Sequence, residues 1–209
     1  MNTLQTIRYV AKPLVFVLCL LPAVLVLTDA FDITGGLGAN PIEAIQDRFG
    51  NWALRFIMIT LAVTPLRRLT GWNWLSRFRR MLGLFTFFYA LMHFLAWLIL
   101  DRELHVGDIL EDLTERPFIT LGFTAVVLLT ALAITSFTAL RRRMGRHWQS
   151  LHNAIYVIAI LGVWHYWWQV KKDITEPLIY AVILTALLGI RLFWRLQRNT
   201  RLATAKQHP

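Results

Sequence analysis

Residues 79–100 read RRMLGLFTFFYALMHFLAWLIL, two arginines followed by an apolar and aromatic run in which His93 is the one side chain that titrates near neutral pH. Asp101 follows directly. A helix needs about 20 apolar residues to cross the hydrocarbon core of a bilayer, and this run supplies them. Because cytoplasmic loops retain Lys and Arg, the two arginines mark the cytoplasmic end. The segment 81–100 is therefore predicted to be a transmembrane helix that runs from the cytoplasm outward.

Five further apolar segments flank this one, at 12–28, 51–66, 117–140, 150–169 and 178–196. The hydrophilic stretches between the segments alternate in charge. All 12 acidic residues lie in three of these stretches, 29–50, 101–116 and 170–177. The remaining stretches contain Lys and Arg but no acid: the N-terminus, 67–80, 141–149 and the C-terminal tail. This sorting predicts an all-α membrane protein, a six-transmembrane-helix bundle with both termini cytoplasmic, folded as a single domain over 1–209.

The composition agrees with a membrane protein and excludes several functions. The chain is 56% hydrophobic with a mean hydropathy of +0.50, more than a soluble surface tolerates. The net charge of +10 is divided among short loops rather than gathered on one domain face, so the expected partner is the lipid bilayer and not nucleic acid. Cys19 is the single cysteine, which excludes an internal disulfide, a thiolate iron–sulfur cluster and covalent haem attachment.

Three of the six histidines lie within predicted spans: His93, His152 and His165. An ionisable side chain inside a span is costly, faces the bundle interior and indicates a functional site. His93 lies seven residues before the end of 81–100, and His165 lies five residues before Val170. At about 1.5 Å per residue, the two lie within a few ångströms of one depth near the outer face. Two facing neutral imidazoles suit six-coordinate haem iron; the alternative is an interhelical hydrogen bond without a cofactor.

His152 lies 13 residues before His165, about 20 Å nearer the cytoplasm. On an ideal helix the two would be rotated about 140° apart, so they would not share one stripe. Arg79 lies on nearly the same helix face as His93 and nearer the cytoplasm. It is expected to face His152, as an axial partner or as a counter-charge to haem propionates. The alternative is an ordinary cytoplasmic loop charge. Arg55 is expected either to reach the headgroups or to pair with a propionate of an outer haem.

Four motifs in order carry a resemblance to a known family. They are Gly38-Ala39-Asn40-Pro41-Ile42-Glu43 with Gly50-Asn51-Trp52-Ala53-Leu54, Thr64-Pro65-Leu66-Arg67-Arg68, Arg79-Arg80-Met81-Leu82-Gly83-Leu84 leading to Tyr89 and His93, and Trp148-x-x-Leu151-His152-x-x-x-Tyr156 followed by His165. Together they resemble the MsrQ (YedZ) family, the haem-binding membrane subunits of periplasmic methionine sulfoxide reductase systems. That family belongs to the wider ferric-reductase-like transmembrane superfamily.

The resemblance implies a multi-pass protein of the bacterial inner membrane with haem b, one or two copies, and FMN as cofactors. It implies electron delivery from the quinone pool to MsrP, the periplasmic molybdopterin subunit that reduces methionine sulfoxide. It carries haem-iron ligation onto His93, His152 and His165. Many members of the superfamily use four histidines, and Arg79 stands at the fourth position here.

Three functions are compatible with the sequence. The first is an electron-transfer subunit that serves a separate periplasmic partner, docked on acidic outer loops such as 101–116. The second is a self-standing transmembrane reductase of ferric ions or oxygen, fed by a separate cytoplasmic flavin reductase. The third is a transporter or scaffold without redox chemistry, which a Soret band in the purified protein would eliminate.

Overall fold

The computed structural model describes residues 3–170 and 172–207, and these residues form helices and no strand. The α-helices are α1 (Thr3–Thr6), α2 (Lys12–Ala30), α3 (Pro41–Thr70), α4 (Arg79–Leu95), α5 (Val106–Glu115), α6 (Pro117–Ile134), α7 (Thr138–Met144), α8 (Arg146–His152), α9 (Ala154–Gln169) and α10 (Thr175–Gln207). Three short helices of other types, η1 (Ile7–Ala11), η2 (Asn73–Arg77) and η3 (Ala96–Asp101), complete the set.

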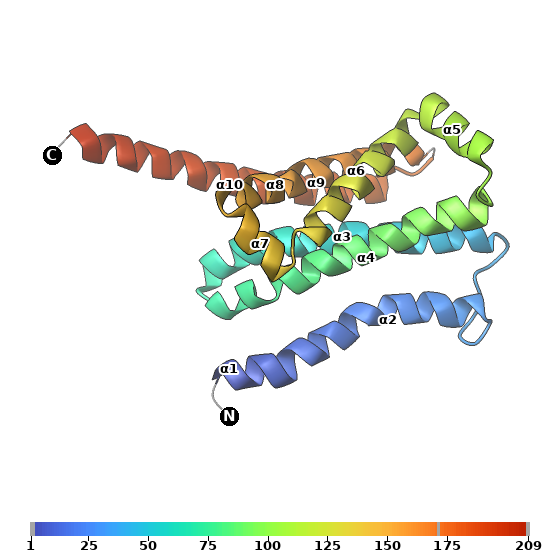
Figure 1. Cartoon of the computed structure of the whole chain (residues 1–209), viewed down its shortest axis with the longest axis horizontal. Coiled ribbons are helices and arrows are strands. Elements are labelled where there is room, and N and C mark those ends of the chain that lie inside the picture. The colour runs from blue at the N-terminus through green and yellow to red at the C-terminus, as the bar shows by residue number, and fades with distance from the viewer. Residues whose placement is uncertain (1–2, 171, 208–209) are drawn as a thin grey trace.

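Helices α3 and α4 form an antiparallel pair at the centre of the bundle (Figure 1). Gly71 makes the turn between them possible, because it ends α3 in the left-handed region, at φ +74°, that a side chain disfavours. Helix α2 lies on one side of the pair, and α6, α9 and α10 lie on the other. The core is centred on this pair, with Leu61, Tyr89 and Ile158 almost fully buried.

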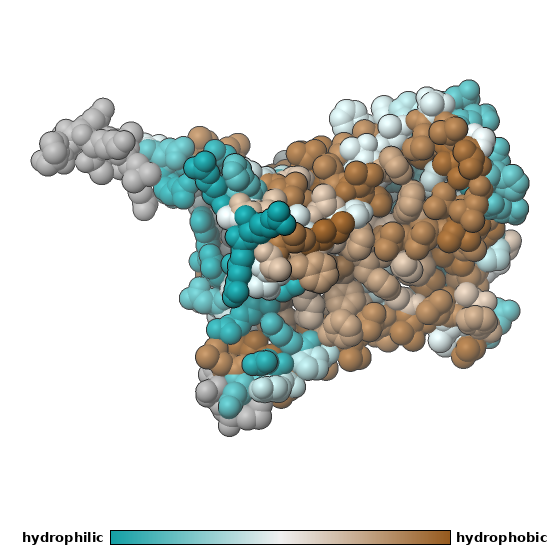
Figure 2. All heavy atoms as spheres, in the orientation of Figure 1, coloured by the Kyte–Doolittle hydropathy of each residue, from teal (hydrophilic) through white to brown (hydrophobic). Residues whose placement is uncertain are grey.

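A broad apolar belt covers the middle of the bundle on the face seen in Figure 2, with hydrophilic residues at both ends. Five helical segments are long and apolar enough to cross a membrane: Leu4–Ala30, Pro41–Thr70, Arg79–Asp101, Pro117–Ile134 and Thr175–Thr200. Large apolar side chains along these segments are exposed, among them Phe16, Leu25, Val127 and Val182. A contiguous belt of this kind fits contact with lipid rather than with water. We name its two flanks the acidic end, which carries Asp101 and α5, and the basic end, which carries Arg67, Arg79 and Arg141.

The predicted spans differ from the helices at several ends. The segment 150–169 forms α8 and then α9, whose 16 residues cover about 24 Å, short of the roughly 30 Å hydrocarbon core. A sixth span is therefore not confirmed. The segment 117–140 is too long as predicted, because α6 ends at Ile134 and the chain turns before α7 begins at Thr138. The Thr135 hydroxyl donates back to the Ala131 carbonyl at this end. The predicted cytoplasmic position of the termini concerns residues 1–2 and 208–209, which lie outside the described residues.

Two polar side chains form hydrogen bonds with main-chain groups near the prolines that interrupt α3 and α2. Pro65 lies inside α3 and has no N–H to give to the Leu61 carbonyl. The Arg191 guanidinium of α10 donates to that carbonyl instead, and its second terminal nitrogen donates to the Tyr156 hydroxyl at 3.1 Å. The sequence analysis counted Arg191 only as one of the C-terminal basic charges. The structure places it partly buried, where it ties α10 to α3 and α9.

Tyr89 does the same at the centre of α2. Its hydroxyl donates to the Cys19 carbonyl at 2.7 Å and accepts from the Ala23 N–H at 3.1 Å. The hydroxyl thus bridges a donor and an acceptor that an unbroken helix would pair directly. Pro22 lies beside this gap, so the aromatic side chain stabilises the bend and fixes α2 against α4.

Candidate cofactor site

His93 and His165 meet inside the bundle near its acidic end. His93 lies on α4 and His165 on α9, and their ring centroids are 6.0 Å apart with the ring planes at 78°. The sequence analysis expected both at one depth from residue counting alone. The structure brings the two rings together edge to face, one from α4 and one from α9, with both side chains partly buried.

Each of these imidazoles is hydrogen-bonded to a main-chain carbonyl of another helix. His93 Nδ1 lies 2.8 Å from the Gln46 carbonyl oxygen on α3, and His165 Nδ1 lies 2.6 Å from the Phe118 carbonyl oxygen on α6. A carbonyl only accepts hydrogen bonds, so in both rings Nδ1 carries the proton and donates it. In a neutral imidazole the other nitrogen, Nε2, is then a bare lone pair that can ligate a metal.

Two glycines make room for these contacts. A Cβ atom built on Gly50 would lie 3.0 Å from His93 Nδ1, and one built on Gly122 would lie 2.9 Å from His165 Nδ1. Each glycine stands four residues after the carbonyl that accepts the bond, where a side chain would cover the approach to it. The two halves of the site therefore have the same arrangement. A carbonyl and a glycine of α3 accommodate the histidine of α4, and those of α6 accommodate the histidine of α9.

Sequence analysis missed these supporting residues. Gly50 was noted as part of a motif without a role, and Gly122, Gln46 and Phe118 were not singled out. The available signal was a glycine inside a strongly apolar helical run, which lowers helix stability and so indicates a packing or functional reason. The two carbonyls had no signal, because every residue has one.

A cavity of ≈ 880 Å³ separates the helices that carry the two histidines. Its walls are mostly aliphatic and aromatic, and besides the histidine pair they include Leu54, Ile57, Ala90, Phe94, Phe123 and Val126. A lining of mainly apolar groups with a few polar ones is typical of cofactor sites. This cavity fits a large apolar ligand that takes its polar bonds from two imidazoles.

The distance between the rings fits a single metal ion between them. Metal–imidazole nitrogen bonds of about 2.0–2.1 Å, plus about 1 Å from nitrogen to ring centroid on each side, give a centroid separation of roughly 6 Å. The described residues contain no group of three or more His, Cys, Asp or Glu side chains placed to hold a metal ion. Two imidazoles in an apolar cavity would therefore suit an iron that takes its other ligands from an organic cofactor, as in haem.

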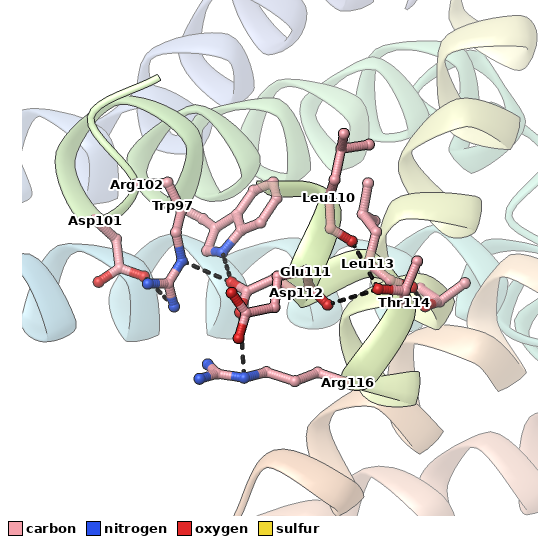
Figure 3. A network of polar contacts seen from close by, with 10 residues as sticks. Trp97, Asp101, Arg102, Leu110, Glu111, Asp112, Leu113, Thr114 and Arg116 are labelled. Atoms are coloured by element: carbon pink, nitrogen blue, oxygen red, sulfur yellow. Dashed lines mark hydrogen bonds and ion pairs between the residues drawn. The ribbon is translucent and has the colours of Figure 1, made fainter. Parts of the chain in front are cut away.

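A polar network closes the acidic end above this cavity. Figure 3 shows the Asp112 carboxylate of α5 between the side chains of Trp97, Arg102 and Arg116. Asp112 is only 4% exposed. Its oxygens accept from the Trp97 indole at 3.2 Å and pair with Arg102 Nε at 2.6 Å and Arg116 Nε at 3.2 Å. Trp97, Arg102 and Arg116 also line a wider cavity that reaches both histidines, so the network forms part of the mouth of the site.

His152 lies apart from the pair, at the end of α8. Its Nε2 is 3.1 Å from the Thr135 hydroxyl, and its ring stacks on Trp148 at 4.0 Å and 26°. The Thr135 hydroxyl also lies 2.7 Å from the Ala131 carbonyl oxygen, so it links the His152 ring to the end of α6. His152 and Arg79 line one further cavity, at the basic end.

Arg55 turns away from the histidine pair. Its Nε donates to the Tyr180 hydroxyl at 3.3 Å, and its guanidinium lies 4.7 Å from the Trp52 ring centroid. It is not among the residues that line either cavity around the two histidines. The expectation that Arg55 binds a propionate of an outer haem gains no support from this placement.

Comparison with known proteins gives the family. Residues 49–163 match the model of the ferric reductase like transmembrane component. Proteins named protein-methionine-sulfoxide reductase heme-binding subunit MsrQ are similar over most of the chain. The one from Herminiimonas arsenicoxydans is 49% identical over 91% of this chain and 88% of its own length. The chain belongs to the MsrQ family.

Other relatives with the same name agree. The protein from Ralstonia nicotianae is 48% identical over 92% of this chain and 88% of its own length, and that from Xanthomonas campestris pv. campestris is 54% identical over 81% and 77%. With its apolar helices, this MsrQ-family chain is a multi-pass protein of the bacterial inner membrane. The family match begins one residue before Gly50, includes His93 and His152, and ends two residues before His165.

Proposed function

We propose that the chain binds haem b between His93 and His165 and serves as the electron-transfer subunit of a methionine sulfoxide reductase system. The observation that carries the proposal is the imidazole pair, 6.0 Å apart, with each Nδ1 held by a main-chain carbonyl. The printed names of the relatives, haem-binding subunits of protein-methionine-sulfoxide reductase, point to the same function.

The residues of the chain set the properties of the bound group. Haem supplies one-electron redox chemistry when bound. Donation from Nδ1 to the carbonyls of Gln46 and Phe118 fixes each ring's orientation and makes Nε2 a stronger base. The apolar walls keep water from the site and lower the local dielectric, which would tune the reduction potential of the bound group. No acidic side chain approaches either Nδ1 within hydrogen-bond distance among the described residues.

The proposed topology has six spans, both termini in the cytoplasm and one domain over 1–209. It is supported by the alternation along the chain of hydrophilic stretches that carry acids with stretches that carry only Lys and Arg. The short α9 would complete its crossing together with α8, since only Asn153 separates them and its backbone is itself helical, at φ −70° and ψ −17°. Local thinning of the bilayer would cover what remains.

The proposed route takes electrons from membrane quinone, with FMN as a second cofactor, to the periplasmic molybdopterin subunit MsrP. Family resemblance supports the donor, the flavin and the acceptor. The outer position of the histidine pair supports an acceptor on that side. On α5, the exposed acids Asp108, Glu111 and Glu115 form one stripe along the helix and are the proposed docking surface for the partner. Ligation of a second haem by His152 stays a prediction, and it would require His152 to give up its bond to Thr135.

The test is absorption spectroscopy and pyridine haemochrome on purified protein. His93→Ala and His165→Ala should each abolish the low-spin haem spectrum, whereas His105→Ala, an exposed histidine near α5, should keep it. A full low-spin spectrum in either variant, or colourless wild-type protein after expression with ample haem, would refute the proposal. Fast reduction of ferric chelates without a partner, and none of an added MsrP, would favour the self-standing reductase.

A further inference from the structure

Helix α5 has an acidic face and an apolar face on opposite sides. Its exposed acids form the stripe proposed above as a docking surface. At about 100° of rotation per residue, the side opposite that stripe carries the apolar residues of the helix: Val106, Ile109, Leu110 and Leu113. Ile109 and Leu113 are partly buried, whereas Val106 is 67% exposed and Leu110 is 57% exposed. Half of this apolar face is therefore left uncovered by the residues that the structure describes.

The turn before α5 adds a third exposed apolar side chain. Leu104 is 58% exposed, and it adopts the left-handed backbone conformation, at φ +61°, directly after Glu103 at φ +47°. A bulky residue rarely adopts this conformation, which glycine adopts without strain. A large side chain at such a position indicates a contact that offsets the strain.

Both ends of α5 fold back onto segments that are apolar enough to cross the membrane. At one end, the Leu104 N–H donates to the Leu98 carbonyl at 3.1 Å, and Leu98 belongs to the segment Arg79–Asp101. At the other end, the Thr120 hydroxyl donates to the Leu113 carbonyl at 2.7 Å, and Thr120 belongs to the segment Pro117–Ile134. These two bonds hold α5 level with the outer turns of both segments, at one end of the bundle (Figure 1).

The uncovered face of α5 continues the apolar belt of the bundle. Ile99 and Leu100, in the last turn of the segment to which Leu104 bonds, are themselves exposed. Figure 3 shows the Leu110 side chain pointing away from the Asp112 network, so this face does not line the mouth of the site. Single exposed apolar residues need no explanation, but a set that extends a lipid-facing belt indicates contact with lipid.

We propose that α5 is an interfacial anchor. Its exposed apolar side chains Val106 and Leu110, together with Leu104, insert into the lipid leaflet at the acidic end, while the acidic stripe faces water. Amphipathic helices lie in this way at the boundary between headgroups and acyl chains, with the apolar face about 5–10 Å deep. Lipid is the partner because the two bonds to the spanning segments set the height of α5 at this boundary. The inference requires a membrane and does not require a bound haem.

The test places an environment-sensitive fluorophore on single cysteines. The chain, in a Cys19→Ser background, is labelled with nitrobenzoxadiazole and reconstituted as a single copy in each phosphatidylcholine nanodisc. Leu110→Cys and Val106→Cys probe the apolar face, Glu111→Cys is the matched control on the opposite face, and Val127→Cys marks the middle of α6. All four replaced side chains are exposed, so thermal unfolding should match that of the Cys19→Ser parent.

The labels on the apolar face should report a shallow lipid environment. At Leu110→Cys and Val106→Cys the emission should shift to shorter wavelength relative to Glu111→Cys. Lipid brominated near its headgroup should quench these two labels more than lipid brominated near its chain ends, because an interfacial helix does not reach the bilayer centre. At Val127→Cys the order of the two lipids should be reversed.

Two results would overturn the inference. Equal emission and equal quenching at Leu110→Cys and Glu111→Cys would show that α5 stands free in water. A blue-shifted label at Leu110→Cys that neither brominated lipid quenches would show that protein, and not lipid, covers the face. The haem spectrum is measured on the same samples. Colourless protein with the expected quenching contradicts only the proposed function, and coloured protein with water-exposed labels contradicts only the anchor.

Discussion

At the scale of single residues, the site depends on side chains that are absent as much as on those that are present. Gly50 and Gly122 leave space that a methyl group would fill, within about 3 Å of the two histidine rings. Contacts this short force the imidazole to move, and the neighbour is a ring held by its own hydrogen bond rather than a flexible chain end.

Replacement of either glycine by alanine should therefore weaken haem binding. We expect Gly50→Ala and Gly122→Ala to cost about 1–3 kcal/mol through overpacking and to lower the haem content measured by pyridine haemochrome. Gly189→Ala is the matched control, because nothing lies within 4 Å of its Cβ position on α10. That variant should keep its haem and gain about 0.5–1 kcal/mol of helix stability. Full haem content in both site variants would mean that the carbonyl bonds do not position the rings.

Arg191 and Pro65 provide a second test at this scale. Arg191→Met should destabilise the protein by about 1–3 kcal/mol, because it leaves the Leu61 carbonyl without a donor. In a Pro65→Ala background the new Ala N–H can bond that carbonyl, so the same Arg191→Met change should cost less. Thermal unfolding in detergent of the two single variants and the double variant gives the coupling energy. Strictly additive effects would show that Arg191 does not replace the missing donor.

At the scale of helices, α5 is fastened over the mouth of the site by one buried carboxylate. Asp112 binds Trp97 on η3, Arg102 just after it and Arg116 just before α6. The Thr120 hydroxyl adds a bond from α6 to the Leu113 carbonyl at 2.7 Å (residues of this region are shown in Figure 3). The C-terminal half of α5 is therefore fastened to residues on both sides of it in the chain, on η3 and just after it and at the start of α6.

Asp112→Asn should loosen α5 without unfolding the bundle. The amide keeps the shape of the side chain and loses the charge that pairs with two arginines, a change of about 1–3 kcal/mol in local stability. We expect faster proteolysis within 102–116 and faster loss of haem. Asp108→Asn, an exposed acid on the same helix, removes the same charge and should change neither rate. Equal proteolysis of the two variants would show that Asp112 does not fasten α5.

The sequence predicted those parts of the molecule that depend on periodicity and charge. Helical content, the apolar belt and the meeting of His93 with His165 follow from run length, from charge at the ends and from rise per residue. It could not predict where α6 ends, because that depends on how Thr135 and Ser136 turn the chain. From the sequence, Arg191 is only a basic residue of the C-terminal region. Its bond to the Leu61 carbonyl could not be predicted, because it depends on how α10 packs against α3. For Gly122, the reason is a contact between residues that are 43 positions apart.

At the scale of the whole molecule, charge divides the bundle into an acidic end and a basic end. Acidic loops translocate more readily than loops rich in Lys and Arg, so the acidic end is expected in the periplasm. The histidine pair then lies toward the periplasm, and the arginines of the basic end lie toward the cytoplasm.

Cysteine labelling of intact cells tests this orientation. In a Cys19→Ser background, a cysteine at Asp108 should react with a membrane-impermeant maleimide added outside, and a cysteine at Arg77 should react only after the inner membrane is opened. Both positions are exposed, so access and not burial decides the result. The reverse pattern would invert the proposed topology.

The main-chain bonds of His93 and His165 have a consequence for the speed of electron exchange. Each ring is hydrogen-bonded within a different helix pair, so the position of one ring depends neither on the other ring nor on a bound ligand. Folding therefore fixes both imidazoles in place. The gain or loss of one electron by a haem bound between them would then move few atoms. In the proposed haem site, these two peptide carbonyls would therefore keep the reorganisation energy of electron transfer low.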